Sequence, residues 1–331
     1  MTRPIRLLVA ESETLEARER RQASVGRSSG ETYKDVLRAI APDAVCDLVR
    51  PVEDGAELPD RIGLQAYDAV FLTGSPLHLY QDTPEVRRQL GFMHAVFASG
   101  TPSFGSCAGL QVAAVAAGGT VRENRRGHEA AFARRITPTP AGLGHKLLAG
   151  RPAAYDAPAI HSDEVERLPE NATLLATNGV TRVQAAEIRH AGGVFWGVQY
   201  HPELPLDEVA GAMRRQAGDL IEQGLAKDES SVEAYAGLIE ALHHEPSRRD
   251  LAWQLGLDQQ VADPALRQAE LRNFIEHLVL PVRRSRGRAS PARRPTTSRD
   301  SASETASSHA ASGNMAGSGG GDPISSRHGQ P

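Results

Sequence analysis

The chain has 331 residues, 40% hydrophobic content and a formal net charge of -4, which allows one large globular domain with appendages or two modest ones. Eight arginines and three acidic residues follow Pro281, which gives this C-terminal segment a net charge of +5. The rest of the chain then has a net charge of -9, so it offers no general attraction for nucleic acid. The two cysteines lack the spacing of zinc ligands, which argues against a disulfide framework and a metal site. No apolar run is long enough to span a membrane. We therefore expect a cytoplasmic protein without a cofactor.

The first part of the chain alternates short apolar runs with helical patterns. The charged segment 11–27 predicts a long loop or an exposed helix, and Ser28 to Glu31 offer a helix start. Strands that alternate with helices indicate a parallel sheet, which gathers ligand groups at the carboxyl ends of its strands. The predicted strands span residues 5–10, 44–49 and 67–73, and the predicted helices span residues 32–40 and 85–99.

A strand, a glycine-rich turn and a helix follow one another within residues 101–119. Gly105 and Gly109 leave room for a turn too tight for larger side chains, and the alanine-rich run behind them favours a helix. Cys107 stands at the tip of this turn, where a helix N-terminus biases a thiol towards thiolate, as in a nucleophile elbow. A small buried cysteine in a glycine-rich turn fits the same residues. Cys46, inside a predicted strand, is interpreted as an inert packing residue.

Beyond the elbow the pattern changes to shorter alternating pieces, and helical spacing resumes over residues 206–225. The last piece feeds into His201-Pro202-Glu203, and an extended backbone would put the imidazole and the carboxylate on one face. A cysteine nucleophile needs a base, which the imidazole could provide, and a group that orients the base, which the carboxylate could provide. An incidental histidine and glutamate on the surface would fit the same tripeptide. The predicted strands of this part span residues 131–138, 159–162, 173–177, 183–189 and 194–199.

The sequence predicts three parts: an α/β domain at 1–225, a helical extension at 226–282 and a disordered tail at 283–331. The helices of the extension either cover the main domain and each other or form a dimer or partner surface. The tail consists mostly of Ser, Ala, Gly, Pro and Arg, so it lacks the apolar residues that ordering requires.

Four motifs in order resemble the class I, or triad-type, glutamine amidotransferases, with similarity to the amidotransferase domain of GMP synthase. They are Gly74-Ser75-Pro76 after a strand, FGSCAGLQ at 104–111, His161-Ser162-Asp163, and GVQYHPE at 197–203. The resemblance covers roughly residues 5–206. It implies an α/β, flavodoxin-like fold with a mostly parallel central sheet flanked by helices.

The resemblance also implies a chemistry, in which Cys107 attacks the carboxamide of glutamine, His201 moves the proton and Glu203 holds His201. A glutamyl thioester forms and ammonia leaves. Backbone N–H groups of Ser75 and Ala108 would hold the oxyanion. The substrate-binding residues implied are Gly74 and Gln111, and the accessory residues are His161 and Asp163, for which a structural loop is an equal alternative.

Three functions stay open because no phosphate loop stands in a strand–helix setting that a synthetase domain would need. The chain is a glutaminase that passes ammonia to a separate ATP-dependent synthetase, a stand-alone hydrolase of γ-glutamyl amides, or a non-catalytic scaffold. Intact Cys107, His201 and Glu203 weigh against the scaffold. A homo-oligomer through the C-terminal helices is a further prediction.

Overall fold

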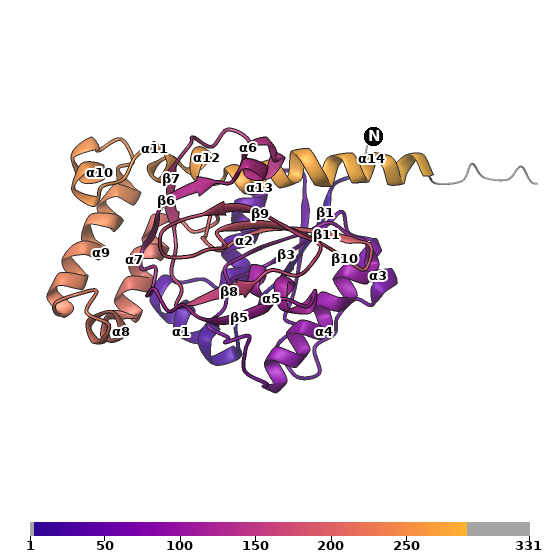
Figure 1. Ribbon diagram of the computed structural model, residues 1–331, viewed down its shortest axis with the longest axis horizontal. Coiled ribbons are helices and arrows are strands. Elements are labelled where there is room, and N and C mark those ends of the chain that lie inside the picture. The colour runs from indigo at the N-terminus through magenta and orange to yellow at the C-terminus, as the bar shows by residue number, and fades with distance from the viewer. Residues whose placement is uncertain (1–2, 290–331) are drawn as a thin grey trace, which may run out of the picture. The chain divides into compact units, whose positions relative to one another are not determined.

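The computed structural model describes residues 3–289, and a nine-stranded sheet lies at its centre (Figure 1). The strands are β1 (Arg6–Ala10), β2 (Val45–Val49), β3 (Ala69–Leu72), β4 (Ser103–Ser106), β5 (Thr120–Glu123), β6 (Phe132–Pro138), β7 (Tyr155–Pro158), β8 (Asp163–Arg167), β9 (Ala172–Thr177), β10 (Ala185–His190) and β11 (Gly193–Val198). The large sheet has the order β2-β1-β3-β4-β11-β10-β9-β6-β7, and β5 pairs with β8 in a separate two-stranded sheet.

Helices flank the sheet and continue after its last strand. They are α1 (Leu15–Val25), α2 (Ser29–Ile40), α3 (Arg61–Gln65), α4 (Pro84–Ser99), α5 (Ala108–Ala116), α6 (Pro140–Gly144), α7 (Leu206–Arg215), α8 (Ala217–Glu222), α9 (Glu229–His244), α10 (Arg249–Leu255), α11 (Gln259–Ala262), α12 (Pro264–Arg267), α13 (Ala269–Phe274) and α14 (Leu280–Ala289), with a 3-10 turn η1 (Lys146–Leu148) and a π-helical turn η2 (Ile275–Val279).

One half of the sheet is parallel and the other half antiparallel. Strands β2, β1, β3, β4 and β11 run in the same direction, and β10, β9, β6 and β7 follow with antiparallel pairing. Parallel strands with helices on both sides must be apolar on both faces, and residues 7–10 of β1 are fully buried. The predicted α/β fold with a largely parallel central sheet is confirmed.

Alternate residues of β1 point into two different cores. Leu7 and Val9 share one core with Tyr33 of α2, whereas Leu8 packs in the other core with Val96 of α4 and with apolar residues of α5. Successive side chains of a strand point to opposite faces, so helices cover both sides of the sheet. The carboxyl ends of the parallel strands stay free to carry functional groups.

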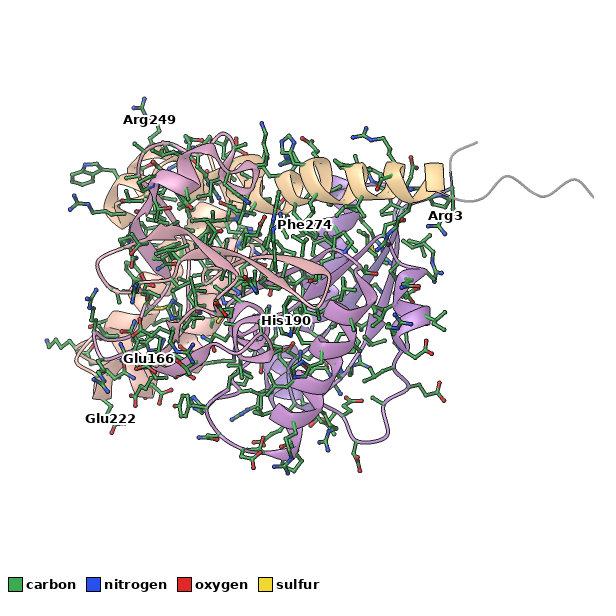
Figure 2. The ribbon with its side chains drawn as sticks, turned by 45° about the vertical axis from the view of Figure 1, so that its right-hand side comes forward. Arg3, Glu166, His190, Glu222, Arg249 and Phe274 are labelled. Carbon is green, nitrogen blue, oxygen red and sulfur yellow. The ribbon has the colours of Figure 1, made fainter. Side chains whose placement is uncertain are left out.

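The C-terminal helices pack against the sheet and against each other. The ring of Phe274, labelled in Figure 2, lies 5.4 Å from that of Phe71 and 5.5 Å from that of Phe104 between centroids, in the same core as α2. Val209 of α7 and Ile239 of α9 belong to a third core on another side of the molecule. In the described residues these helices therefore cover the main domain and each other, which is the first of the two interpretations above.

Some local predictions are wrong. Residues 159–162 were expected to be a strand, but they connect β7 to β8 and form a single bridge between His161 and Glu129. The strand lies instead at 163–167, where the charged sequence DEVER buries its first three residues. The helix expected at 206–225 is divided at Gln216 into α7 and α8.

The segment 11–27 and the C-terminal part also differ from expectation. The segment forms α1, but the residues before that helix are enclosed, with Glu11 fully buried and Glu13 only 7% exposed. Residues 3–289 belong to one compact unit, and the predicted division at 225 stays a prediction. Of the predicted tail, residues 283–289 end α14 and 290–331 lie outside the described residues. No helix between residues 3 and 289 has the length and apolar character to cross a membrane.

Candidate active site

Cys107 stands in a tight turn between β4 and α5. Its backbone has φ 53° and ψ -113°, a left-handed conformation that costs a residue with a Cβ about 1–3 kcal/mol. Two close backbone contacts enforce the turn: a Cβ added to Gly105 would lie 2.8 Å from the carbonyl carbon of Gly109, and one added to Gly109 would lie 2.7 Å from the carbonyl oxygen of Leu72. The glycines of the predicted elbow are therefore needed for close packing, and the thiol is held at the start of α5.

His201 and Glu203 form a buried pair directly after β11. The Nδ1 atom of His201 lies 2.7 Å from Oε1 of Glu203, and the backbone N–H of His201 donates to the carbonyl of Pro158 at 2.7 Å. The segment is a turn, because β11 ends at Val198, so the expectation of an extended His-Pro-Glu is wrong. The predicted contact between the two side chains is present nevertheless.

Gly74 brings the strand end of β3 against both Cys107 and His201. A Cβ on Gly74 would lie 2.7 Å from Cε1 of His201 and 3.6 Å from the Cβ of Cys107. A larger residue would collide with the imidazole, so the loop after β3 can approach only as glycine. Residues from three neighbouring strand ends thus meet at one point.

The charge state of His201 is set by its two neighbours. Burial disfavours the imidazolium, but the carboxylate of Glu203 and the sulfur of Cys107 both favour it and raise the pKa of His201 to about 10. Since Nδ1 is bonded to Glu203, the Nε2 atom is the one left for the cysteine and a substrate.

A hydrogen-bonded chain supports Glu203 from behind. The hydroxyl of Ser106 donates to Oε1 of Glu203 at 2.9 Å, and the phenol of Tyr33 lies 2.6 Å from the Ser106 oxygen. Burial, reinforced by the charge of Glu203, raises the pKa of Tyr33 well above its ordinary value, so the phenol stays protonated and donates to Ser106. Sequence reasoning missed both residues. Ser106 directly precedes the cysteine, which was the one available signal.

A cavity of about 530 Å³ opens over these groups. Of the predicted site residues it is lined by Gly74, Ser75, Cys107, His201 and Glu203. It continues to Glu13, which precedes α1, and to side chains of α1 and α7, including Arg21 and Arg215; sequence reasoning did not assign these residues to the site. Ala108 is the first residue of α5, so its backbone N–H has no partner within the helix.

Gln111 lies behind the elbow and does not line the cavity. Its amide donates to the carbonyl of Asp163 at 3.2 Å and to Oε1 of Gln199 at 3.3 Å, and the residue is 2% exposed. In this structure Gln111 joins α5 to the start of β8. Its expected role in substrate binding stays a prediction.

His161 and Asp163 belong to a second polar cluster away from this cavity. Nε2 of His161 lies 3.0 Å from Glu129, and its Nδ1 lies 2.9 Å from the carbonyl of Asp163. Burial disfavours the charged carboxylate of Glu129, but its hydrogen-bond donors outweigh burial and lower its pKa. The side chains that surround Glu129 within hydrogen-bond distance are His161, Asn178, Thr181 and Gln184.

No group of three or more His, Cys, Asp or Glu side chains between residues 3 and 289 has an arrangement that would hold a metal ion. What the site offers chemically is a thiol on a strained turn, a histidine with a raised pKa and a carboxylate that orients it. This arrangement suits nucleophilic attack on an acyl carbon.

Residues 37–216 match the family model described as glutamine amidotransferase class-I. The chain is 35% identical over 283 residues to γ-glutamyl-L-1-hydroxyisopropylamide hydrolase from a Pseudomonas species, a match that covers 84% of this chain and 94% of that protein. It is 31% identical over 140 residues to a glutamine-hydrolysing GMP synthase from Leifsonia xyli, covering 42% of this chain and spanning only 26% of that protein.

The fold is also similar to a solved structure, that of a glutamine amidotransferase from Thermotoga maritima. The two agree with a TM-score of 0.58 at 18% sequence identity, over 84% of this chain and 99% of that one. At this level of identity the likeness concerns the arrangement of helices and strands.

Proposed function

The chain belongs to the class-I glutamine amidotransferases, and we propose that it is a stand-alone hydrolase of γ-glutamyl amides. In this proposal Cys107, His201 and Glu203 form a catalytic triad, and water is the final acceptor of the glutamyl group. The observation that carries it is local: Cys107 on its strained turn and His201, bonded to Glu203 at 2.7 Å, line one cavity.

The relative from Pseudomonas supports water as the acceptor. That protein is named as a hydrolase of a γ-glutamyl amide, and the match extends over 94% of its length. A likeness over nearly the whole of both chains supports a shared reaction type better than a likeness to a quarter of a larger enzyme. The stand-alone hydrolase is the second of the three functions that the sequence leaves open.

The first half of the proposed reaction forms a thioester. His201 takes the proton of Cys107, and the thiolate attacks the γ-carbonyl carbon, so a C–S bond forms and the carbonyl oxygen becomes an oxyanion. Backbone N–H groups of Ser75 and Ala108 donate to that oxyanion, and loss of one such donor raises a barrier by about 2.7–4 kcal/mol. The C–N bond then breaks, and His201 gives its proton to the leaving amine.

The second half regenerates the enzyme. His201 takes a proton from a water molecule, the hydroxide attacks the thioester, and the C–S bond breaks to release glutamate, while His201 returns its proton to the sulfur of Cys107. Glu203 holds the imidazole in orientation and stabilises its positive charge through both halves. No other reactant is needed for the atoms to balance.

Ammonia transfer to a separate synthetase is the second candidate function. It is favoured by the match to a GMP synthase, although the chain spans only 26% of that enzyme. In this case the substrate is glutamine itself, and an ATP-dependent partner takes the ammonia. A non-catalytic scaffold is the remaining alternative.

The deciding experiment measures amine release by the purified full chain. We expect hydrolysis of γ-glutamylethylamide without any partner, at a kcat/KM at least equal to that on glutamine. Activity confined to glutamine that rises when a GMP synthetase subunit is added would favour the second candidate. An inactive chain would favour the scaffold.

The two cysteines provide a matched pair of variants. Cys107→Ala is expected to lose at least about 10⁴-fold in kcat, because removing the nucleophile of a triad has an effect of this size. Cys46→Ala keeps its activity, since burial raises the pKa of that thiol in β2 and leaves it inert. Equal activity of Cys107→Ala and the wild type would contradict the triad.

A further inference from the structure

The cavity is larger than the triad alone. Besides Cys107, His201 and Glu203 it is lined by Leu204, by residues of α7, and by residues before and within α1. Its volume of about 530 Å³ lies in the range of roughly 300–1,000 Å³ that holds drug-sized ligands, whereas a molecule of the size of ammonia needs only about 15 Å³. The cavity is therefore much larger than ammonia requires, and it has room for a substituent on the leaving nitrogen in addition to the glutamyl part of the substrate.

The proposed chemistry determines which part of the substrate enters this space. Donors at Ser75 and Ala108 fix the carbonyl oxygen on one side of the sulfur, and the leaving nitrogen must reach His201 to be protonated. A substituent on that nitrogen then lies on the His201 side of the reacting carbon, in the cavity that His201 and Glu203 line together with residues of α1 and α7.

Glu13 is a buried carboxylate in the lining of the cavity. It is 7% exposed and follows β1, and its Oε2 accepts only a long hydrogen bond, 3.3 Å, from the backbone N–H of Ser29. Its Oε1 lies 3.9 Å from Arg21. A carboxylate has about four acceptor positions, so Glu13 keeps acceptor capacity for a ligand.

The position of Glu13 is tied to the catalytic loop by hydrogen bonds. The hydroxyl of Ser29 donates to Thr73 at 3.2 Å, and Thr73 donates to the carbonyl of Gly74 at 3.0 Å. Since Gly74 lies against His201, this chain of contacts connects the carboxylate to the reacting groups. Glu13 is thus held at a defined place relative to the triad.

The two helices that border the cavity, α1 and α7, are fixed relative to each other. Arg21 of α1 forms an ion pair with Glu208 of α7, which is 1% exposed and also accepts from Thr32 at 2.7 Å. A Cβ on Gly211 of α7 would lie 2.5 Å from the side chain of Val25, so the two helices are in close contact. The cavity between them is a preformed space.

We propose that the space between α1 and α7 is a subsite for the leaving amine, and that Glu13 is a specificity-determining residue that accepts a hydrogen bond from a donor on that amine. The inference rests on the proposed hydrolase function. The substrates it names are γ-glutamyl amides of small amines that carry a hydroxyl or an ammonium group two carbons from the amide nitrogen.

The experiment compares four substrates by kcat/KM on the full chain. γ-Glutamylethanolamide and γ-glutamyl-aminoethylamide carry the hydroxyl and the ammonium, γ-glutamylpropylamide has the same length without a donor, and glutamine has no substituent. We expect a donor-bearing amide to exceed the propylamide by about 30-fold, because a site that hydrogen-bonds a substrate group rejects the analogue without it. The better of the two donor amides identifies the donor.

Variants of Glu13 test its role through the ratio of donor amide to propylamide. Glu13→Gln is expected to lower the ratio about fivefold, because a charged acceptor is replaced by a neutral one, and Glu13→Met is expected to bring it close to one. Glu16→Gln is the control, a nearby carboxylate in the first turn of α1 whose side chain is 80% exposed and does not line the cavity, and it leaves the ratio unchanged. Thermal unfolding verifies that each variant is folded.

The outcomes separate this inference from the proposed function. A wild-type ratio near one overturns the inference without using any variant, and so does a high ratio that Glu13→Met leaves intact. An equal loss on all four substrates, with the ratio unchanged, would mean that Glu13 contacts the glutamyl part or only supports the fold, and this also overturns it. Failure to hydrolyse any of the four substrates rejects the proposed function itself.

Discussion

Among residues 3–289, the His201–Glu203 pair and the His161–Glu129 pair are both buried, and the first of them lines the cavity described above. In the pair beside Cys107 the nitrogen and oxygen of His201 and Glu203 are 2.7 Å apart, and in the other pair those of His161 and Glu129 are 3.0 Å apart. By separation and burial alone the two pairs are nearly equivalent. They differ in what else contacts each member.

The second pair has its hydrogen-bonding capacity filled. Both ring nitrogens of His161 have partners, and Glu129 lies within hydrogen-bond distance of four side chains. In the first pair, Oε2 of Glu203 has no hydrogen-bond partner among residues 3–289, and Nε2 of His201 is left for the cysteine. A buried pair with every position filled holds the fold together, whereas one with free positions on a cavity is equipped for chemistry.

Matched variants of the two histidines are expected to differ most. His201→Asn should lower kcat by at least about 10⁴-fold, because the base of the proposed triad is lost. His161→Asn should stay within about tenfold in kcat but lose about 3 kcal/mol of unfolding free energy, since a buried pair is broken. Steady-state kinetics and urea unfolding measure the two quantities. A folded His161→Asn protein as inactive as His201→Asn would remove the distinction.

The carboxylates should differ in the same sense. Glu203→Gln is expected to lower kcat by about 10³-fold or more, since the imidazole loses the acceptor that orients it. Glu129→Gln should mainly lower the midpoint of thermal unfolding, because the amide cannot accept from all four neighbours. Equal kinetic losses in the two variants would indicate that both pairs serve catalysis.

The two pairs should also respond to opposite ends of the pH scale. The pKa of His201 is raised to about 10, so its stabilising effect is full below about pH 6.5 and disappears as the pH rises through about 10. The pKa of Glu129 is lowered, so its effect is present above about pH 4.5 and is lost as the pH falls further. Urea unfolding of wild type, His201→Asn and Glu129→Gln across pH measures each contribution, with a slope of at most about 1.4 kcal/mol per pH unit.

This pH prediction fails if the difference in unfolding free energy between wild type and His201→Asn is constant from pH 6.5 to pH 10. Titration of the His201 ring by NMR is an independent measurement. Cys107→Ala should lower its pKa, because the sulfur is one of the two groups that favour the imidazolium.

The smallest effects are expected behind the first pair. Ser106→Ala removes a hydrogen bond to the charged Glu203 and should lower kcat by about 20-fold. Tyr33→Phe removes the bond one step further away and should lower kcat by about fivefold, with KM nearly unchanged. A larger loss for Tyr33→Phe than for Ser106→Ala would show that the chain is not ordered in this way.

The sequence predicts the elbow well because its constraints are local. Gly105 and Gly109 are needed for close backbone packing, and each lies two residues from Cys107 in the sequence. His201 and Glu203 are also near neighbours in sequence, and their contact survives a turn where an extended backbone was expected. The alternation of apolar runs with helical patterns was enough to predict the parallel half of the sheet.

What the sequence does not indicate depends on contacts between distant segments. Tyr33 and Ser106 are 73 positions apart, and no feature of either residue predicts the bond between them. In the sequence Glu13 belongs to a charged stretch that is expected to be exposed, but the folded chain buries it. The strand at 163–167 is equally difficult to predict from the sequence. Its residue Glu164 has the character of a surface residue, but it pairs with Arg122 of β5 at 2.9 Å.

Phe274 has a consequence for the order in which the chain acquires its structure. A polypeptide leaves the ribosome from its N-terminus, so Phe71 and Phe104 are synthesised long before the ring that covers them. Until then this face of the nascent sheet stays open, and exposed aromatic surface of this kind promotes aggregation. Truncated chains that end before residue 274 therefore lack more than a terminal helix. They lack the aromatic ring that covers Phe71 and Phe104 in the core.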